Sequence, residues 1–204
     1  MSDQQHWQQV YQTKAAEDVS WYQPDAALSL ELIAACQQSA QSAIIDIGGG
    51  ASLLVDALLA QGYTNLTVLD LSAAALAVSQ ARLGAAAAAV NWLVADVTSA
   101  ELPRQYQLWH DRAVFHFLTD PAQRASYLAL LNTAVVKGGQ VIIATFAEDG
   151  PERCSGLPVQ RYTAAALQAE FAGVLQLITS QREAHQTPFG TTQHFTWCHF
   201  IKVV

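Results

Sequence analysis

A glycine-rich segment that carries an acid is the part of the chain best suited to bind a ligand. Asp46 stands two residues before Gly48, Gly49 and Gly50, between an apolar run and a helical pattern. Glycines between a strand and a helix let the backbone approach a ligand closely and adopt positive φ. The helix N-terminus that follows attracts an anion, whereas Asp46 would repel a pyrophosphate but hold an ammonium group. The segment therefore suits a ligand that has both a carboxylate and an ammonium group, unless it is a plain turn.

Three more acids each end an apolar run farther along the chain. Asp70 could accept hydrogen bonds from a ribose diol, and Asp96 could receive an adenine amino group, with Val97 beside the ring. Asp111 could bind the amino-acid end of the same ligand. Each acid also has a plainer reading, as a helix cap or a turn residue. Their common position at strand ends favours one site for an amino acid joined to a nucleoside.

S-adenosylmethionine is a ligand of that kind, and we expect it to be the cofactor, with S-adenosylhomocysteine as the product. The expected contacts come from the glycine segment, the strand ends and an N-terminal aromatic pair: Asp46, Gly48, Gly49, Gly50, Asp70, Leu71, Asp96, Val97, Asp111, Arg112, Trp21 and Tyr22.

A catalytic group is not evident. Methyl transfer is an in-line displacement with a good leaving group, so positioning and desolvation can supply much of the rate. A base is needed only if the acceptor must lose a proton. His116 is the candidate for that role, although a lone histidine is more often structural.

The elements that must hold these residues alternate between strand and helix. Such alternation predicts parallel strands with helices on both faces of the sheet. In the last third, a loop over 148–158 and a short helix precede two strand-like runs that predict an antiparallel hairpin at the sheet edge. The expected strands are 43–47, 66–71, 90–95, 107–111, 140–146, 175–182 and 195–203, and the expected helices are 26–36, 53–60, 73–83, 121–135 and 163–171.

Composition narrows the range of functions. With 51% hydrophobic residues in 204, the chain can fill the core of one domain. A formal net charge of −7 and scattered basic residues argue against nucleic-acid or anionic-membrane partners. No apolar stretch is long enough to span a membrane. Three separated cysteines without a CxxC pair predict neither a metal site nor disulfides, and the polar N-terminus does not read as a signal peptide. We expect a cytoplasmic monomer or homodimer.

From residue 40 to residue 146 the chain resembles the class I S-adenosylmethionine-dependent methyltransferases. The glycine segment looks like that family's acidic first motif, and Asp70 and Asp96 match its ribose-side and adenine-side acids. The stretch from Asp111 is similar to the segment after its fourth strand, and the run from Gly138 matches its fifth strand. The resemblance implies a three-layer αβα sandwich whose mostly parallel seven-stranded sheet has an antiparallel C-terminal strand. The family often has glycine where Ser52 stands, and Ser52 could cap the helix instead.

The resemblance also divides the single domain, 1–204, into three parts. Residues 1–36 would form a lid like that of small bacterial members, with Trp7 and Tyr11 joining Trp21 and Tyr22 over the sulfonium; ordinary packing on the sheet is the alternative. Residues 40–146 would bind the cofactor. Residues 147–204 would face the acceptor.

The methyl acceptor is left open between a small molecule and a protein, with lysine as one option. The loops 146–162 and 185–194 are its candidate surroundings. Their acids Glu148, Asp149 and Glu152 could attract an amine, and Arg161 or Arg182 could meet a carboxylate; the plainer reading for all of them, and for Arg153, is a solvated surface. Cys154 reads as a bystander.

Two other functions compete with methyl transfer. An NAD-dependent oxidoreductase would have G-x-G-x-x-G, but Leu53 occupies the place of the final glycine. A non-catalytic cofactor-binding or partner-binding module fits the absence of an assignable base.

Overall fold

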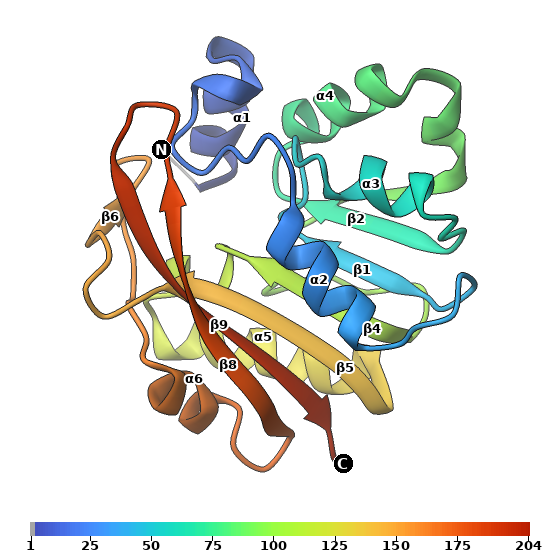
Figure 1. The fold of residues 1–204 in the computed structure, drawn as a ribbon, viewed down its shortest axis with the longest axis vertical. Helices are drawn as coiled ribbons and strands as arrows, with labels where there is room; N and C mark the ends of the chain where they lie inside the picture. Colours follow the sequence, from blue (N-terminus) through green and yellow to red (C-terminus); the bar gives the residue numbers. More distant parts are fainter. Residues whose placement is uncertain (1–2) are drawn as a thin grey trace.

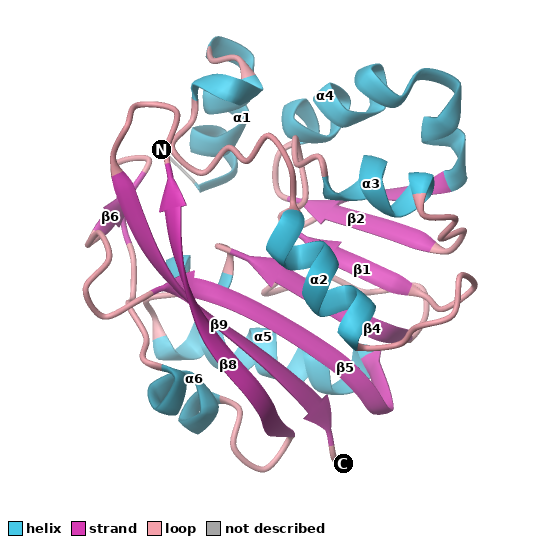
Figure 2. Ribbon diagram, viewed as in Figure 1, coloured by secondary structure: helices cyan, strands magenta, loops and turns pink. Residues whose placement is uncertain are grey.

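The computed structural model describes residues 3–204; residues 1 and 2, the start of the expected lid, lie outside the described part. Seven strands form one sheet in the order β3-β2-β1-β4-β5-β9-β8. Helices lie on both of its faces, so the molecule has three layers (Figures 1 and 2). The predicted αβα sandwich, with a mostly parallel sheet and an antiparallel C-terminal strand, is confirmed.

The parallel part of the sheet contains the strands that the expected site residues follow. β9 enters antiparallel between β5 and the edge strand β8. The strands are β1 (Ile44–Ile47), β2 (Leu66–Asp70), β3 (Val90–Val94), β4 (Tyr106–Arg112), β5 (Val135–Phe146), β8 (Leu175–Gln186) and β9 (Thr192–Lys202), and a separate hairpin consists of β6 (Arg153–Cys154) and β7 (Leu157–Pro158).

The direction of strand order reverses at β1. This strand pairs in parallel with β2 on one side and with β4 on the other. Open α/β sheets bind ligands at such a point, in the crevice beyond the carboxyl ends of the strands. The topology thus brings the ends of β1, β2 and β4 to one crevice.

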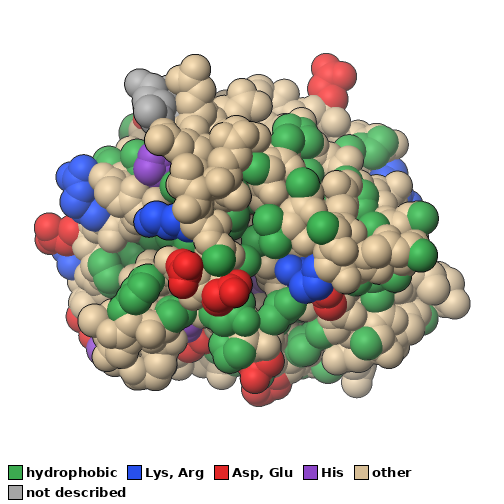
Figure 3. Space-filling view, turned by 90° about the horizontal axis from the view of Figure 1, so that it is seen from above, with side chains coloured by type: hydrophobic (Ala, Val, Ile, Leu, Met, Phe, Trp, Pro, Cys, Tyr) green, Lys and Arg blue, Asp and Glu red, His purple; other side chains and the backbone are tan. Residues whose placement is uncertain are grey.

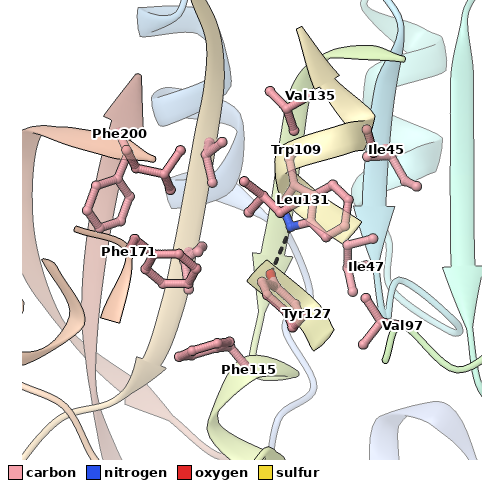
Figure 4. Close-up of a cluster of buried hydrophobic side chains, with 14 of the residues drawn as sticks. Ile45, Ile47, Val97, Trp109, Phe115, Tyr127, Leu131, Val135, Phe171 and Phe200 are labelled. Atoms are coloured by element: carbon pink, nitrogen blue, oxygen red, sulfur yellow. Dashed lines mark hydrogen bonds between the residues drawn. The ribbon is translucent and has the colours of Figure 1, made fainter. Parts of the chain in front are cut away.

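Two hydrophobic clusters hold the helices on the sheet. One lies under α2 (Ala27–Ala35), α3 (Leu54–Ala60) and α4 (Ala73–Leu83). The other lies under α5 (Pro121–Ala134) and α6 (Ala164–Glu170), and it is rich in aromatic rings (Figure 4). Side-chain caps start three helices, with Ser72, Asp120 and Thr163 accepting from the first-turn N–H groups of α4, α5 and α6.

The N-terminal segment contains a helix that its sequence did not predict. α1 (Asp3–Thr13) and a 3-10 turn (Ala16–Asp18) precede α2. α1 lies beside the N-terminal end of α4 (Figure 1). Only Val10 of this helix is buried, and so the apolar periodicity that predicts a packed helix is weak here.

β5 starts five residues earlier than the expected strand 140–146. Val135 already pairs with Tyr106, and the register then shifts before Leu108 meets Gln140. Gly138 has φ of 77°, a conformation that suits glycine. The two glycines that predicted a turn therefore lie within an irregular strand. Over residues 3–204, no helix is both long enough and apolar enough to cross a membrane.

Candidate cofactor and acceptor cleft

The glycine segment turns sharply at the end of β1. Gly48 has φ of 68°, and its N–H donates to Leu69 O at 2.7 Å. A Cβ on Gly49 would stand 2.3 Å from Asp46 Oδ2, and one on Gly50 would stand 2.5 Å from Asp70 Oδ2. The backbone therefore runs so close to both carboxylates that only glycine fits.

Asp70 ends β2 and borders the cleft from its floor. Its side chain is buried and accepts from the N–H of Ser72 at 2.8 Å. Burial raises the pKa of Asp70 to about 7, although hydrogen bonds from Ser72, Gly50 and Leu71 lower it. The carboxylate lines the cleft and is therefore placed to accept hydrogen bonds from a ligand.

The ends of β2 and β3 supply an acidic and apolar corner to the same cleft. Asp96 is exposed, and its Oδ1 accepts from Thr98 N at 2.8 Å and Thr98 Oγ1 at 2.7 Å. Val97 is buried beside it, and Leu71 also lines the cleft. The turn-forming role of Asp96 and its place at the cleft are thus both present.

Asp46 is already engaged inside the protein. Its Oδ1 lies 2.7 Å from His110 Nδ1, and His110 Nε2 lies 3.0 Å from Ser29 Oγ. This chain of contacts ties β1 to β4 and α2. Asp46 still borders the cleft beside the glycine segment, so one carboxylate oxygen serves the protein and the other faces the glycines.

Aromatic side chains of the N-terminal segment line the cleft. Trp7 packs edge-on against Trp21 and Phe117, with ring centroids 5.5 Å and 5.1 Å away. Trp21 Nε1 donates to the hydroxyl of Tyr11 at 3.1 Å. Burial raises the pKa of Tyr11, so its hydroxyl stays neutral.

The cleft consists of two neighbouring compartments that share lining residues. The first lies over β2 and β3, and the second lies beside the glycine segment and α2; Gly48, Tyr11, Trp21 and Arg112 border both. Tyr22, Gly49 and Asp46 border the second compartment only. Most of the predicted contact residues thus lie around these two neighbouring compartments. Gly50 lines neither compartment but lies close to the Asp70 carboxylate.

Asp111 is a correction to the predicted set, because its carboxylate points into the core. It is completely buried and accepts from the hydroxyl of Tyr127 at 2.7 Å and from Val114 N at 2.9 Å. Tyr127 in turn accepts from Trp109 Nε1 at 2.8 Å (Figure 4). Burial raises the pKa of Asp111 to about 6. Asp111 borders neither compartment and is a structural residue.

The structure also contradicts the role of His116 as a proton acceptor. Its ring is fully buried, and Nδ1 accepts from Phe146 N at 3.2 Å. Burial, followed by the charge of Arg112, lowers the pKa of His116 to about 3. With Nδ1 accepting, the single ring proton of the neutral form lies on Nε2. His116 therefore has no free lone pair to offer.

Arg112 ends β4 on the face opposite Asp111. Its Nη1 donates to Trp21 O at 3.0 Å, and its Cζ lies 4.7 Å from the centre of the Phe195 ring. Nε and Nη2 are buried and have no hydrogen-bond partner within residues 3–204. Arg112 is thus a largely enclosed cation at the junction of the two compartments.

Several residues that border the first compartment were not predicted to do so. They include Asp3, Phe117, Gln123 and Cys154. Burial raises the pKa of the Cys154 thiol to about 12, so it is a neutral wall residue. Asp3 and Gln123 lie on α1 and α5, where no sequence signal separates them from ordinary surface residues. Phe117 directly follows His116 in a stretch that had been singled out.

The charged side chains of the C-terminal loops are paired with one another. Arg182 contacts Glu148 at 2.7 Å and also pairs with Asp149, which lies 3.0 Å from His194 Nδ1. Arg161 lies 3.1 Å from Glu152. On the face shown in Figure 3, acidic and basic side chains are likewise interspersed. These acids are therefore already paired, although at exposed positions where an ion pair contributes little.

Comparison with known proteins agrees with this geometry. Residues 44–139 match the family model described as a methyltransferase domain. A 107-residue stretch is 34% identical to malonyl-[acyl-carrier protein] O-methyltransferase of Anoxybacillus flavithermus (strain DSM 21510 / WK1). That match spans 52% of this chain and only 39% of the relative.

Solved structures share the fold over nearly the full chain. N-methyltransferase NodS of Bradyrhizobium japonicum WM9, in complex with S-adenosyl-L-homocysteine, has a TM-score of 0.72 at 15% identity, covering 96% of this chain and 97% of that one. A chain solved for the conversion of a disulfide bond into a thioacetal group during echinomycin biosynthesis has a TM-score of 0.77 at 20% identity, covering 98% and 93%.

The crevice at the strand reversal, the glycine segment that only glycine can form and the acids beside it fit a ligand made of an amino acid and a nucleoside. Residues 44–139 match the methyltransferase-domain family model, and the fold of the chain is that of solved methyltransferases.

Proposed function

We propose that this protein transfers a methyl group from S-adenosylmethionine to a small-molecule or protein acceptor by in-line displacement. The observation that carries the proposal is the convergence of Gly48, Asp70, Asp96 and the N-terminal aromatic residues on one cleft. The cofactor supplies an activated methyl group. The residues of this chain hold the two reactants in line and keep water away from them.

Each part of the cleft suits one part of the cofactor. Asp70 would accept hydrogen bonds from the ribose hydroxyls, and Asp96 with Val97 would meet the adenine. The glycine segment would lie along the amino-acid end. Trp21 and Tyr22 would cover the sulfonium side, where an aromatic face favours positive charge.

No group of the cleft is assigned as a base. Tyr11 and Cys154 are kept neutral by burial, and their pKa values are raised. Asp70 would bind the ribose hydroxyls. We infer that the acceptor presents an available lone pair when it binds, so that alignment carries the reaction.

The acceptor class is the least defined part of the proposal. A lysine amine remains one candidate, although the acids of the C-terminal loops are paired. The sequence relative is an O-methyltransferase of a malonyl group on acyl-carrier protein, and this keeps a carrier-bound acyl group among the candidates. A cytoplasmic location and a monomeric or homodimeric state stay predictions.

Calorimetric titration with S-adenosylmethionine, S-adenosylhomocysteine and NAD tests the cofactor assignment. We expect binding of the first two in the micromolar range and no binding of NAD. Preferential NAD binding would instead support an oxidoreductase.

A radiolabelled methyl group tests the transfer. Protein and labelled cofactor are incubated with cell extract, which is then separated into macromolecular and small-molecule fractions. Label in either fraction supports the proposal and identifies the acceptor class. Label in neither, despite tight cofactor binding, favours a non-catalytic binding module.

Asp70→Ala tests the ribose contact. We expect cofactor binding to weaken by about 1–3 kcal/mol, because the ribose hydroxyls lose a charged acceptor. The matched control is Asp56→Ala, which removes a carboxylate that pairs with Arg82 at 2.6 Å away from the cleft lining. Equal cofactor affinity in wild type and Asp70→Ala would remove Asp70 from the site.

A further inference from the structure

One edge of the Arg112 guanidinium has no partner. Nη1 donates to Trp21 O, whereas Nε and Nη2 are buried and unpaired within the described part of the chain. In the planar guanidinium group, Nε and Nη2 direct their N–H bonds along the same edge. The unpaired donors are thus two parallel N–H groups rather than two unrelated ones.

The positive charge of Arg112 has no carboxylate in contact either. Glu183 is the acid whose charge has the largest effect on the pKa of Arg112. However, Glu183 Oε1 accepts from Gln23 Nε2 at 2.9 Å, and Oε2 accepts from Trp197 Nε1 at 2.8 Å. Asp46 is engaged with His110. A buried cation without a bonded anion is destabilising, so the residue is suited to receive an anion.

The charge of Arg112 affects two neighbouring histidines. It lowers the pKa of both His116 and His185, after the larger effect of burial. His185 Nε2 contacts Ser20 O at 2.9 Å. Both histidines are thus kept neutral, so Arg112 is the cation that an incoming anion would meet.

Arg112 borders both compartments, but its stacking partner favours the acceptor over the cofactor as the source of that anion. Its guanidinium lies over Phe195 of β9, which is two strands beyond β4 in the sheet. Cys154 of β6 borders the first compartment. Phe195 and Cys154 both lie in the part of the chain after the strands that are expected to bind the cofactor.

We propose that the Nε and Nη2 edge of Arg112 binds a carboxylate of the methyl acceptor, so that the acceptor is a carboxylic acid. This inference rests on the proposed function, because it assumes a cofactor in the cleft. Two parallel N–H donors match the two oxygens of a carboxylate, a geometry that lysine cannot reproduce. The Trp21 carbonyl and the Phe195 ring hold the guanidinium plane in place.

The proposal also limits what is methylated. A carboxylate whose two oxygens accept from Arg112 serves as an anchor, so a different atom of the acceptor attacks the methyl group. Trp7, Trp21 and Phe117 line the compartment next to Arg112, and they suit an acceptor whose remaining part is flat or apolar.

Benzoate and benzamide are matched probes for this edge, because they share shape and differ in charge. The protein is saturated with S-adenosylhomocysteine and titrated with each probe by calorimetry. We expect wild type to prefer benzoate by about tenfold or more, as for a hydrogen bond to a charged group. Arg112→Gln should abolish the preference, and Arg112→Lys should retain only part of it. Circular dichroism checks that both variants fold.

Equal binding of the two probes to wild type would overturn the proposal. So would a loss of S-adenosylhomocysteine affinity in Arg112→Gln with unchanged affinity for 5′-methylthioadenosine, which lacks the amino-acid end, because Arg112 would then hold the cofactor carboxylate. Failure of the proposed function looks different. Wild type would not bind S-adenosylhomocysteine, while the benzoate preference of the unloaded protein would still report on the Arg112 edge.

Discussion

Asp70 and Asp111 have similar sequence surroundings, but the pleat of their strands directs the two side chains to different faces of the sheet. Both follow apolar runs, and burial raises the pKa of both. Successive side chains of a strand point to opposite faces, so Asp111 joins Trp109 on the α5 face while Arg112 joins His110 on the other. Tyr127, 16 residues later, completes the core contact of Asp111. No local pattern reveals that partner.

The raised pKa of Asp70 makes cofactor binding depend on pH. A ribose hydroxyl donates a stronger hydrogen bond to the carboxylate than to its protonated form, so S-adenosylhomocysteine affinity should rise as pH increases through about 7. Asp70→Asn should bind weakly with little of this dependence. Calorimetry over the neutral range measures both proteins, and parallel profiles would exclude Asp70 as the titrating group.

The same pKa predicts the sign of a stability effect in the unliganded protein. The folded state holds the Asp70 proton up to about pH 7, whereas the unfolded chain releases it near 3.8. The contribution of Asp70 to the free energy of unfolding therefore increases as pH falls from about 7 towards 4. The difference between wild type and Asp70→Asn isolates it from the other buried groups.

Tyr127 and Tyr106 form a matched pair for the structural role of Asp111. Both are completely buried, but the Tyr127 hydroxyl bonds Asp111 and Trp109, whereas the Tyr106 hydroxyl has no partner in the described chain. Tyr127→Phe should cost about 1–3 kcal/mol of stability, and Tyr106→Phe should cost little or none. Urea denaturation measures both. Equal losses would contradict this reading, and cofactor affinity should change in neither variant.

At the scale of elements, α1 depends on its contact with α4. Gln8 Oε1 accepts from Ser72 Oγ and from Ala74 N, each at 3.1 Å. Ser72 is itself the cap of α4 and directly follows the cleft residues Asp70 and Leu71. One glutamine thus links the N-terminal segment to the strand end that is expected to hold the ribose.

Gln8→Ala should loosen this link. We expect faster amide hydrogen exchange in 3–13 and faster cofactor dissociation, since two hydrogen bonds of about 0.5–1.5 kcal/mol each are lost. Gln9→Ala is the control, because Gln9 is exposed on the same helix. Exchange that is the same in both variants would show that Gln8 does not fasten α1.

At the scale of the molecule, the cleft joins parts far apart in the chain. It includes Trp7 and Tyr11 from the N-terminal segment and Cys154 from beyond β5. A ligand bound there should stabilise the whole domain, by about 2.7 kcal/mol at a hundredfold excess over Kd. Thermal unfolding with S-adenosylhomocysteine measures this, with NAD as the control. An unchanged melting temperature would contradict binding to the folded state.

The parallel sheet and its strand ends are predictable because the local pattern and the tertiary structure agree there. The α4 range 73–83 matches the expected helix, and β1 and β2 differ from expectation by a residue. α1 was missed because Trp7 packs on Trp21 and Phe117, which are distant in sequence. The roles of Asp111, His116 and Arg112 likewise depend on partners that only the folded chain supplies.

The place of β9 has a consequence for how the molecule is formed. β8 precedes β9 along the chain, yet it is attached to the sheet only through β9, which pairs Phe146 with Phe195 and Gln140 with Ile201 across a long sequence separation. Closing such a distant pairing is slow. Until it closes, β5 has an open edge, and the hairpin of β8 and β9 is not attached to the sheet. The time before residues 192–202 insert is therefore when this protein is most exposed to misassembly with other copies of itself.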